Sequence, residues 1–234
     1  MFEAQSTGNG ISIYHFVNSI ANPRNVLEVG CGAGGILSVF KKNGSEVLGL
    51  DFDEDYLKAA RENGVHVRKG SLDLLSESDK FELIILSHVL EHIVNPVRFL
   101  KQLSKHLQKD GIIFIEVPSL DNICVGDYEL DLLNYWQNAH VIHFTTKSLE
   151  LVCKLAGLQK IKATSTIRSC WKIANNDRTL TDADKINSFE YSKSLLNNIE
   201  NNRQSYKGKI ILAKRFILTT LNQALQKLGI RGIA

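Results

Sequence analysis

The stretch NVLEVGCGAGG, residues Asn25–Gly35, decides the fold of this chain. A short apolar run carries one acid, Glu28, into four glycines within six positions. This run fits the pattern G-x-G-x-x-G, in which a strand turns sharply into a helix and the backbone approaches a ligand closely. A carboxylate beside the turn is a poor neighbour for a phosphate, because it adds negative charge where an anion would bind. The stretch therefore favours a ligand that carries a cationic amine or sulfonium.

Strand and helix patterns alternate on both sides of the glycines. Helices are predicted at 10–20, 36–42, 55–63, 96–107, 146–156 and near 186–199, and strands at 26–29, 46–52, 65–70, 81–89, 111–118, 158–163 and 167–174. This alternation predicts an α/β chain whose mostly parallel seven-stranded sheet has helices on both faces. Ligands of such sheets bind at the carboxyl ends of the strands, where the strand order reverses.

Composition excludes several classes of protein. No run of about 18 apolar residues is present, and the first ten residues lack the basic start and apolar stretch of a secretory signal. The cysteines show neither a CxxC pair nor a zinc-ligand spacing. We therefore expect a cytoplasmic protein with reduced thiols and no metal site.

The charge is distributed unevenly along the chain. Residues 201–234 carry seven Lys or Arg and no acid, so residues 1–200 sum to −4 within a net charge of +3. We predict a ligand-binding domain at 1–174, with an N-terminal helix, and a polar linker with a basic amphipathic helical extension at 175–234. Such a helix can lie on an anionic membrane, here through residues 207–231. The alternative is that it packs on its own domain or on a second subunit in a homodimer.

Four segments in order resemble the successive motifs of class I S-adenosylmethionine-dependent methyltransferases. They read VLEVGCGAGG, VLGLDFDEDYLKAA, FELIILSHVLEHIVNP and GIIFIEVP, and the resemblance covers about residues 20–160. It implies a Rossmann-like fold, S-adenosylmethionine as cofactor and methyl transfer as the reaction. The segment at 116–158 is similar to small-molecule methyltransferases of bacterial glycan and nucleotide-sugar pathways. That similarity implies a sugar or lipid-linked glycan hydroxyl as acceptor. The basic C-terminal segment would also suit a nucleic acid, but the absence of an Asn-Pro-Pro-Tyr-type motif for base methylation makes that an unlikely partner.

The resemblance also implies roles for individual residues. Glu28 would order the surroundings of the cofactor's amino group, Asp51 would accept hydrogen bonds from its ribose, and Phe52 would pack on its adenine. The glycines would let the methionine and ribose lie against the backbone. The other residues that the resemblance places at the cofactor are Gly30, Cys31, Gly32, Gly34, Ser71, Leu72, Asp73 and Ser87.

Histidines are the candidates for the chemistry. If the acceptor is a hydroxyl, a general base adds about 10²–10⁴-fold to the rate, and histidine suits neutral pH. His143 and His140 lie at the end of a long segment, 118–145, that should arch over the carboxyl edge of the sheet, and His88 is the second choice. The alternative is that His140 and His143 only orient the loop by hydrogen bonding. Tyr135 and Trp136 could form an apolar wall or stack on a sugar ring.

Two other classes of protein compete with a methyltransferase. A nicotinamide-dependent oxidoreductase also has G-x-G-x-x-G with an acid about 20 residues on, here Asp51. Glu28 and the segment SHVLEHI argue against that class. The second alternative is a catalytically inactive module that keeps only the cofactor-binding fold.

Overall fold

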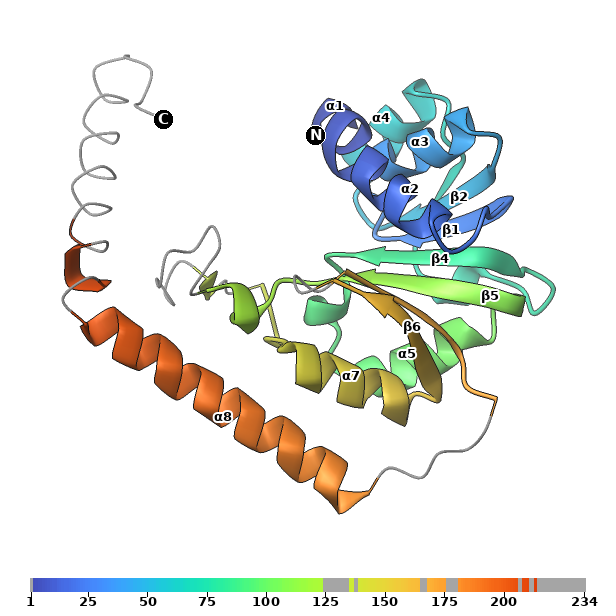
Figure 1. The fold of residues 1–234 in the computed structure, drawn as a ribbon. Helices are drawn as coiled ribbons and strands as arrows, with labels where there is room; N and C mark the ends of the chain where they lie inside the picture. Colours follow the sequence, from blue (N-terminus) through green and yellow to red (C-terminus); the bar gives the residue numbers. More distant parts are fainter. Residues whose placement is uncertain are drawn as a thin grey trace, which may run out of the picture.

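A seven-stranded sheet forms the centre of the molecule (Figure 1). The structure is a computed structural model and describes residues 2–123, 135–136, 139–164, 168–175, 181–205, 208–210 and 213. The strands are β1 (Asn25–Val29), β2 (Glu46–Asp51), β3 (Val67–Lys69), β4 (Phe81–Ser87), β5 (Leu107–Glu116), β6 (Leu158–Ala163) and β7 (Arg168–Ile173). They lie in the order β3-β2-β1-β4-β5-β7-β6, which confirms the predicted Rossmann-like, mostly parallel sheet. β7 pairs antiparallel with both β5 and β6.

Helices cover both faces, as predicted. α2 (Gly10–Asn18), α3 (Gly35–Lys42) and α4 (Glu54–Glu62) pack on one face, and α5 (Pro96–Ser104) and α7 (Thr146–Leu155) on the other (Figure 1). Successive strand residues point to opposite faces. In β4, Leu83 and Ile85 therefore belong to the α2–α4 core, while Ile84 and Leu86 belong to the α5–α7 core. A strand buried on both faces reads as a continuous apolar run, which is why β4 was recognisable in the sequence.

Three element boundaries differ from the prediction. The helix expected to reach Leu107 ends at Ser104, and Leu107 instead begins β5, where it pairs with Phe81. The N-terminal helix is preceded by α1 (Phe2–Ala4) and a π-helical turn, Gln5–Asn9, which were not expected. The long helix α8 runs from Asp182 to Gln204, because a Thr181–Asp184 capping box starts it four residues earlier than expected.

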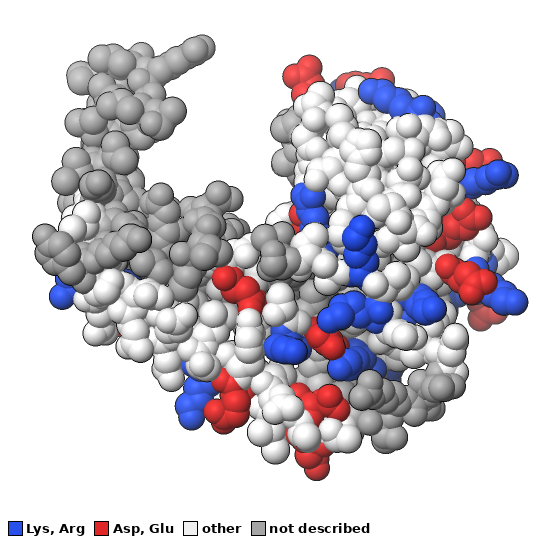
Figure 2. Space-filling model, viewed as in Figure 1, with Lys and Arg blue, Asp and Glu red and all other residues white. Residues whose placement is uncertain are grey.

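α8 packs on the domain rather than standing apart from it. Tyr191 donates a hydrogen bond to Asp121, the hydroxyls of Ser192 and Thr145 lie 3.3 Å apart, and Ile199 is buried against Leu120 and its neighbours. Most of the predicted basic amphipathic helix, residues 207–231, lies outside the described residues. None of the helices in the described part combines the length and hydropathy that crossing a bilayer requires. On the face drawn in Figure 2, basic and acidic side chains are interspersed over the described residues.

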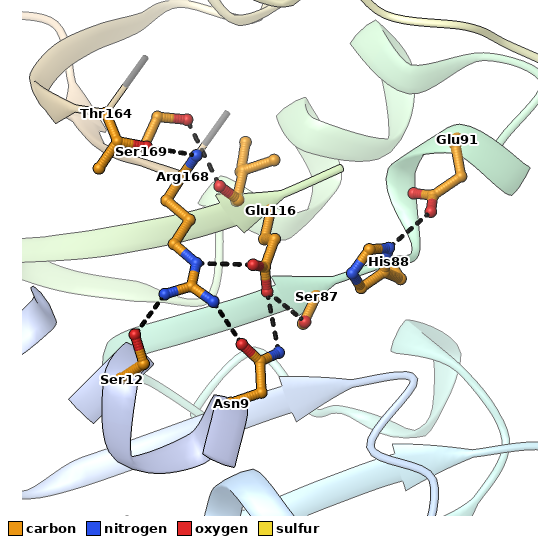
Figure 3. Close-up of polar contacts among 10 residues, drawn as sticks. Asn9, Ser12, Ser87, His88, Glu91, Glu116, Thr164, Arg168 and Ser169 are labelled. Atoms are coloured by element: carbon orange, nitrogen blue, oxygen red, sulfur yellow. Dashed lines mark hydrogen bonds and ion pairs between the residues drawn. The ribbon is translucent and has the colours of Figure 1, made fainter. Parts of the chain in front are cut away.

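A buried polar network fastens the N-terminal segment to the sheet. Glu116, at the end of β5, accepts hydrogen bonds from Arg168 Nε at 2.6 Å, Ser87 Oγ at 2.9 Å and Asn9 Nδ2 at 3.1 Å (Figure 3). The Arg168 guanidinium also donates to Ser12 Oγ and to Asn9 Oδ1. Burial works to raise the pKa of Glu116, but Arg168 and the other donors bring it below its ordinary value. The network therefore holds a carboxylate, and through it α2, at the ends of β4, β5 and β7.

We expect Arg168→Met to lower the free energy of unfolding by about 3 kcal/mol, as measured by urea denaturation at pH 7. The substitution leaves the buried Glu116 without its cation, and the figure is at the low end for a broken buried pair because both side chains keep some contact with water. Lys160→Met is the matched control, since it removes the partner of Glu150 at a more exposed ion pair and should cost about 1 kcal/mol or less. Equal losses in the two variants would contradict a special role for the network.

Candidate functional site

The glycine turn lies where the strand order reverses. β1 pairs with β2 on one side and with β4 on the other, so the turn after β1 lies between the ends of both neighbours. Gly30 and Gly34 have φ angles of 72° and 75°, in the left-handed region that favours glycine. A Cβ on Gly30 would meet Val89 Cγ2 at 2.5 Å. The turn is therefore in contact with the segment that follows β4, and a larger residue at Gly30 would force the two apart.

Asp51 ends β2 and supports this turn. Its Oδ2 accepts a hydrogen bond from the Gly32 amide at 2.8 Å, and its Oδ1 accepts one from the Asp53 amide at 3.0 Å. An ionised carboxylate offers about four acceptor positions. Two positions therefore stay available for the hydroxyls of a ligand that lies on the turn. The side chain of Phe52, next in the chain, is 72% exposed, so its ring is accessible to a ligand on the turn.

Glu28 is buried beneath the turn at 1% exposure. Burial and then the charge of Asp51 raise the pKa of Glu28 well above its usual value, against a backbone hydrogen bond from Leu37 that lowers it. Its Oε2 is buried and has no hydrogen-bond partner among the described residues. A ligand with a positive charge near Asp51 and Glu28 would offset the repulsion between these two carboxyl groups.

The remaining predicted cofactor residues lie in three places. Ser71, Leu72 and Asp73 begin the short 3-10 turn after β3, on the β2 side of the glycine turn. Ser87 donates to Glu116 and so belongs to the buried network. The Cys31 side chain lies in the core, where its Sγ would be 2.5 Å from a Cβ placed on Gly49. For Cys31, only the backbone could face a ligand.

These residues fit S-adenosylmethionine. The cofactor has a cationic sulfonium and amine, a ribose diol and an adenine. The structure offers a buried carboxylate with an unpaired oxygen, a carboxylate with spare acceptor positions at the end of β2, and an exposed aromatic ring beside it. The positive φ angles of the glycines leave the backbone open to close approach.

His88 follows β4 directly and has an unusual backbone. Its φ is 56°, a left-handed value that is costly for a residue with a side chain and that clusters at functional sites. Its Nδ1 lies 3.5 Å from Oε1 of Glu91, which is buried (Figure 3). The partnership with Glu91 raises the pKa of His88, burial works against this, and the charge of Glu116 adds to the rise.

His140 and His143 approach His88 and Glu91 from the long segment before α7. The amides of Val141 and Ile142 both donate to the carbonyl oxygen of Glu91, at 3.0 and 3.1 Å, and so bind the two loops together. His92 donates from Nδ1 to the carbonyl of Ala139 at 2.8 Å. These hydrogen bonds place the end of the segment 118–145 near the carboxyl end of β4. Residues 124–134 and 137–138, over which the segment was expected to arch across the sheet edge, lie outside the described residues.

Two aromatic side chains, Tyr135 and Trp136, lie beside His143. The ring centroid of Trp136 lies 4.6 Å from that of His143, and the ring centroid of Tyr135 lies 5.1 Å from it. Neither nitrogen of His143 has a hydrogen-bond partner among the described residues. Burial lowers the pKa of His143, and the neighbouring His140 lowers it further. These effects favour the neutral form of His143, whose two ring nitrogens are both shielded from solvent.

Sequence reasoning did not identify several residues of the site. Glu116, Arg168 and Asn9 meet only through long-range contacts, and no local pattern marks them. From the sequence, His92 with Glu91 is interpreted as a helix-start pair that fixes the loop, and neither residue is chosen as a candidate for the chemistry.

Comparison with known proteins agrees with this geometry. The profile of the methyltransferase domain family matches residues 12–163, well over half of the chain. The ubiquinone biosynthesis O-methyltransferase of Rickettsia canadensis is 24% identical over 203 residues, covering 78% of this chain and 84% of the relative. The enzyme with the same name from Pelagibacter ubique is 29% identical over 99 residues, covering 38% of this chain and only 40% of the relative.

A solved structure shares the fold. The crystal structure of a SAM-dependent methyltransferase from Archaeoglobus fulgidus superposes with a TM-score of 0.54 at 21% identity, over 87% of this chain and 91% of that one. At this identity the likeness shows the fold alone. Neither the nicotinamide-dependent oxidoreductase nor the inactive module is favoured by these matches. The family match, on a fold whose glycine turn and acids fit the cofactor, identifies the chain as a member of the methyltransferase domain family and as a class I S-adenosylmethionine-dependent methyltransferase.

Proposed function

We propose that this methyltransferase acts on a hydroxyl oxygen of a small molecule. The observation that carries the proposal is the group of histidines at the carboxyl end of β4, which lies against the glycine turn through the contact between Val89 and Gly30. A hydroxyl must lose its proton as its oxygen is methylated, and a neutral imidazole can take that proton. The relatives from Rickettsia canadensis and Pelagibacter ubique are named O-methyltransferases, which supports an oxygen acceptor.

The residues around the glycine turn would hold the cofactor. When bound, S-adenosylmethionine supplies a methyl group on a cationic sulfur, which is already a good leaving group. Asp51 would accept hydrogen bonds from the ribose, Phe52 would cover the adenine, and Glu28 would provide the negative charge near the cationic end. The contribution of the protein to the reaction is then mainly positioning, which can account for roughly 7–11 kcal/mol of barrier in ideal cases.

His143 is the residue that we assign as general base. A histidine that merely orients its loop should hydrogen-bond to that loop, and His92 does this through Ala139. Both nitrogens of His143 lack such a partner among the described residues. His140 and His88 are the alternative bases, but His88 is engaged by Glu91.

The acceptor carries a ring in this proposal. Trp136 is 57% exposed beside His143, and an exposed aromatic face can stack on the apolar face of a sugar or on an aromatic ring. The sequence predicts a sugar, nucleotide sugar or lipid-linked glycan, whereas the named relatives belong to ubiquinone biosynthesis. Contact with an anionic membrane through residues 207–231, and a homodimer, stay predictions.

An acceptor screen tests the function. The untagged chain would be incubated with S-adenosylmethionine and a panel of nucleotide sugars, glycans and dihydroxylated aromatic acids, and release of S-adenosylhomocysteine would be measured with mass analysis of the product. We expect a product 14 mass units heavier, with the methyl group on oxygen. Methylation of amine or carbon acceptors only would refute the proposal.

Cofactor affinity should depend on Asp51. We expect Asp51→Ala to weaken S-adenosylmethionine binding at least about tenfold, because it removes charge-assisted hydrogen bonds worth about 1.5–3 kcal/mol each. Isothermal titration calorimetry measures the change. Asp53→Ala is the control: Asp53 lies two residues away and caps α4 through the amides of Asp55 and Tyr56. Its loss should lower stability by about 1 kcal/mol without changing affinity. Unchanged binding by the Asp51 variant would remove the assignment.

Turnover should depend on His143. His143→Ala should lower kcat about 10²-fold or more while cofactor affinity stays the same, because the variant loses the proton acceptor and not a cofactor contact. The matched control is His66→Ala, an exposed histidine before β3. Single-turnover kinetics with the acceptor found in the screen would separate chemistry from product release. A loss of less than tenfold would return His143 to an orienting role.

A further inference from the structure

Three potential metal ligands meet beside the carboxyl end of β4. One atom each from Glu91, His92 and His140 lies within 4.8 Å of the other two. The first two come from the turn after β4 and the third from the segment before α7. The backbone hydrogen bonds from Val141 and Ile142 to the Glu91 carbonyl hold these two segments together. The backbone hydrogen bonds therefore hold the three residues of the cluster close to one another.

Within this cluster, Glu91 is the residue whose buried carboxylate a cation would stabilise. Its side chain is 1% exposed, and neither carboxylate oxygen has a hydrogen-bond partner among the described residues. The nearest cationic group is the half-exposed His88, whose Nδ1 lies 3.5 Å from Oε1. Buried carboxylates are found paired, fully hydrogen-bonded or bound to a metal. A single long contact with a histidine leaves one of the two oxygens without any partner.

His92 retains one ring nitrogen that could bind a metal. Its Nδ1 lies 2.8 Å from the carbonyl oxygen of Ala139. A carbonyl can only accept, so the proton of the neutral ring is on Nδ1 and the lone pair is on Nε2. Metal-binding histidines are commonly oriented by such a hydrogen bond from the second nitrogen. His140 adds a second imidazole, whose Nδ1 is buried without a partner among the described residues, and its ring centroid lies 5.0 Å from that of His92.

We propose that Glu91, His92 and His140 bind one divalent transition-metal ion next to the methyl-transfer site. Two imidazoles and one carboxylate suit Zn²⁺ and its neighbours, whereas Mg²⁺ and Ca²⁺ prefer oxygen ligands alone. Three protein ligands also leave coordination positions open, as in catalytic sites. Bond lengths of about 2.0–2.2 Å place ligand atoms about 3–4 Å apart. Closing from 4.8 Å needs only small rotations of His92, which is exposed, and His140, which is partly exposed.

The open positions give the ion a role in the reaction. Glu91 lies beside His88 and His140 lies beside His143, so an ion held by Glu91 and His140 would lie near both of these histidines. An acceptor hydroxyl that bound to the ion would become more acidic. Its proton would pass to His143, whose ring centroid lies 5.9 Å from that of His140. The oxygen–carbon bond would then form as the carbon–sulfur bond breaks, which leaves a neutral thioether. This role rests on the proposed function, but binding of the ion does not.

Metal titration tests the site without any acceptor. The untagged full-length chain would be stripped with EDTA, dialysed and titrated with Co²⁺, whose visible absorption reports ligand geometry. Zn²⁺ and Mg²⁺ would then be used as competitors. We expect one Co²⁺ per chain, displaced by Zn²⁺ and not by equal Mg²⁺. Elemental analysis of the dialysed Zn²⁺ complex gives the stoichiometry independently.

Variants assign the ligands. His140→Ala should weaken Co²⁺ binding at least about tenfold, since even residues that only support ligands change affinity by about 10–100-fold. His140 is partly exposed, so this variant should fold, and its thermal unfolding would be checked. Glu91→Gln should have the same effect if it folds, and His66→Ala is the control that keeps wild-type binding.

Three results would overturn the site: no stoichiometric Co²⁺ or Zn²⁺ binding, wild-type affinity in His140→Ala, or equal competition by Mg²⁺. Its failure is distinguishable from failure of the proposed function. Hydroxyl methylation at full rate by a chain that binds no Co²⁺ or Zn²⁺ would refute the metal site alone. One bound ion, lost in His140→Ala, together with methylation of nitrogen or carbon only, would refute the hydroxyl acceptor and leave the site in place.

Discussion

The contact between Gly30 and Val89 is the constraint on which the site depends. β1 and β4 are neighbours at the point where the strand order reverses, so their carboxyl ends deliver the glycine turn and the histidine segment to one place. The absence of a side chain on Gly30 lets the two segments touch, because a Cβ there would lie 2.5 Å from Val89. In the reaction that we propose, this contact would bring a cofactor on the turn within reach of an acceptor beside the histidines.

Most of the fold could be predicted because periodicity is a local property. β4 and the core of β5 are continuous apolar runs, and Pro96 marks the start of α5. The prediction went wrong at Leu107, which suits the apolar stripe of a helix and the first position of a strand equally well. Only its pairing with Phe81 decides between them. The length of α8 was underestimated for a related reason. Its residues are mostly polar, so they give little periodic signal, and its start depends on a cap at Thr181.

The residues of the site also differ in how far apart they lie in the sequence. The glycines, Glu28 and Asp51 lie within 24 residues of each other and form a recognisable motif. Asn9 and Glu116 are 107 residues apart, and Arg168 is 52 residues beyond Glu116. His92 and Ala139 are separated by 47 residues. Such pairs leave no periodic trace in a single sequence, so the histidines could be named as candidates but their partners could not.

Three glutamates are buried at the carboxyl edge of the sheet. They differ in how fully the described residues hydrogen-bond their carboxylates. Glu116 accepts from Arg168, Ser87 and Asn9, and is neutralised within the protein. Glu28 and Glu91 are each 1% exposed and each keep oxygens without a hydrogen-bond partner. Leaving a carboxylate buried and unpaired is costly, so such a group either takes up a proton, which the raised pKa of Glu28 favours in the absence of a ligand, or binds a cation. Glu28 precedes Gly30 closely in the chain and Glu91 closely follows Val89, so both acids lie next to the Gly30–Val89 contact. The cations that we propose for them are a sulfonium or amine beside Glu28 and a metal ion beside Glu91.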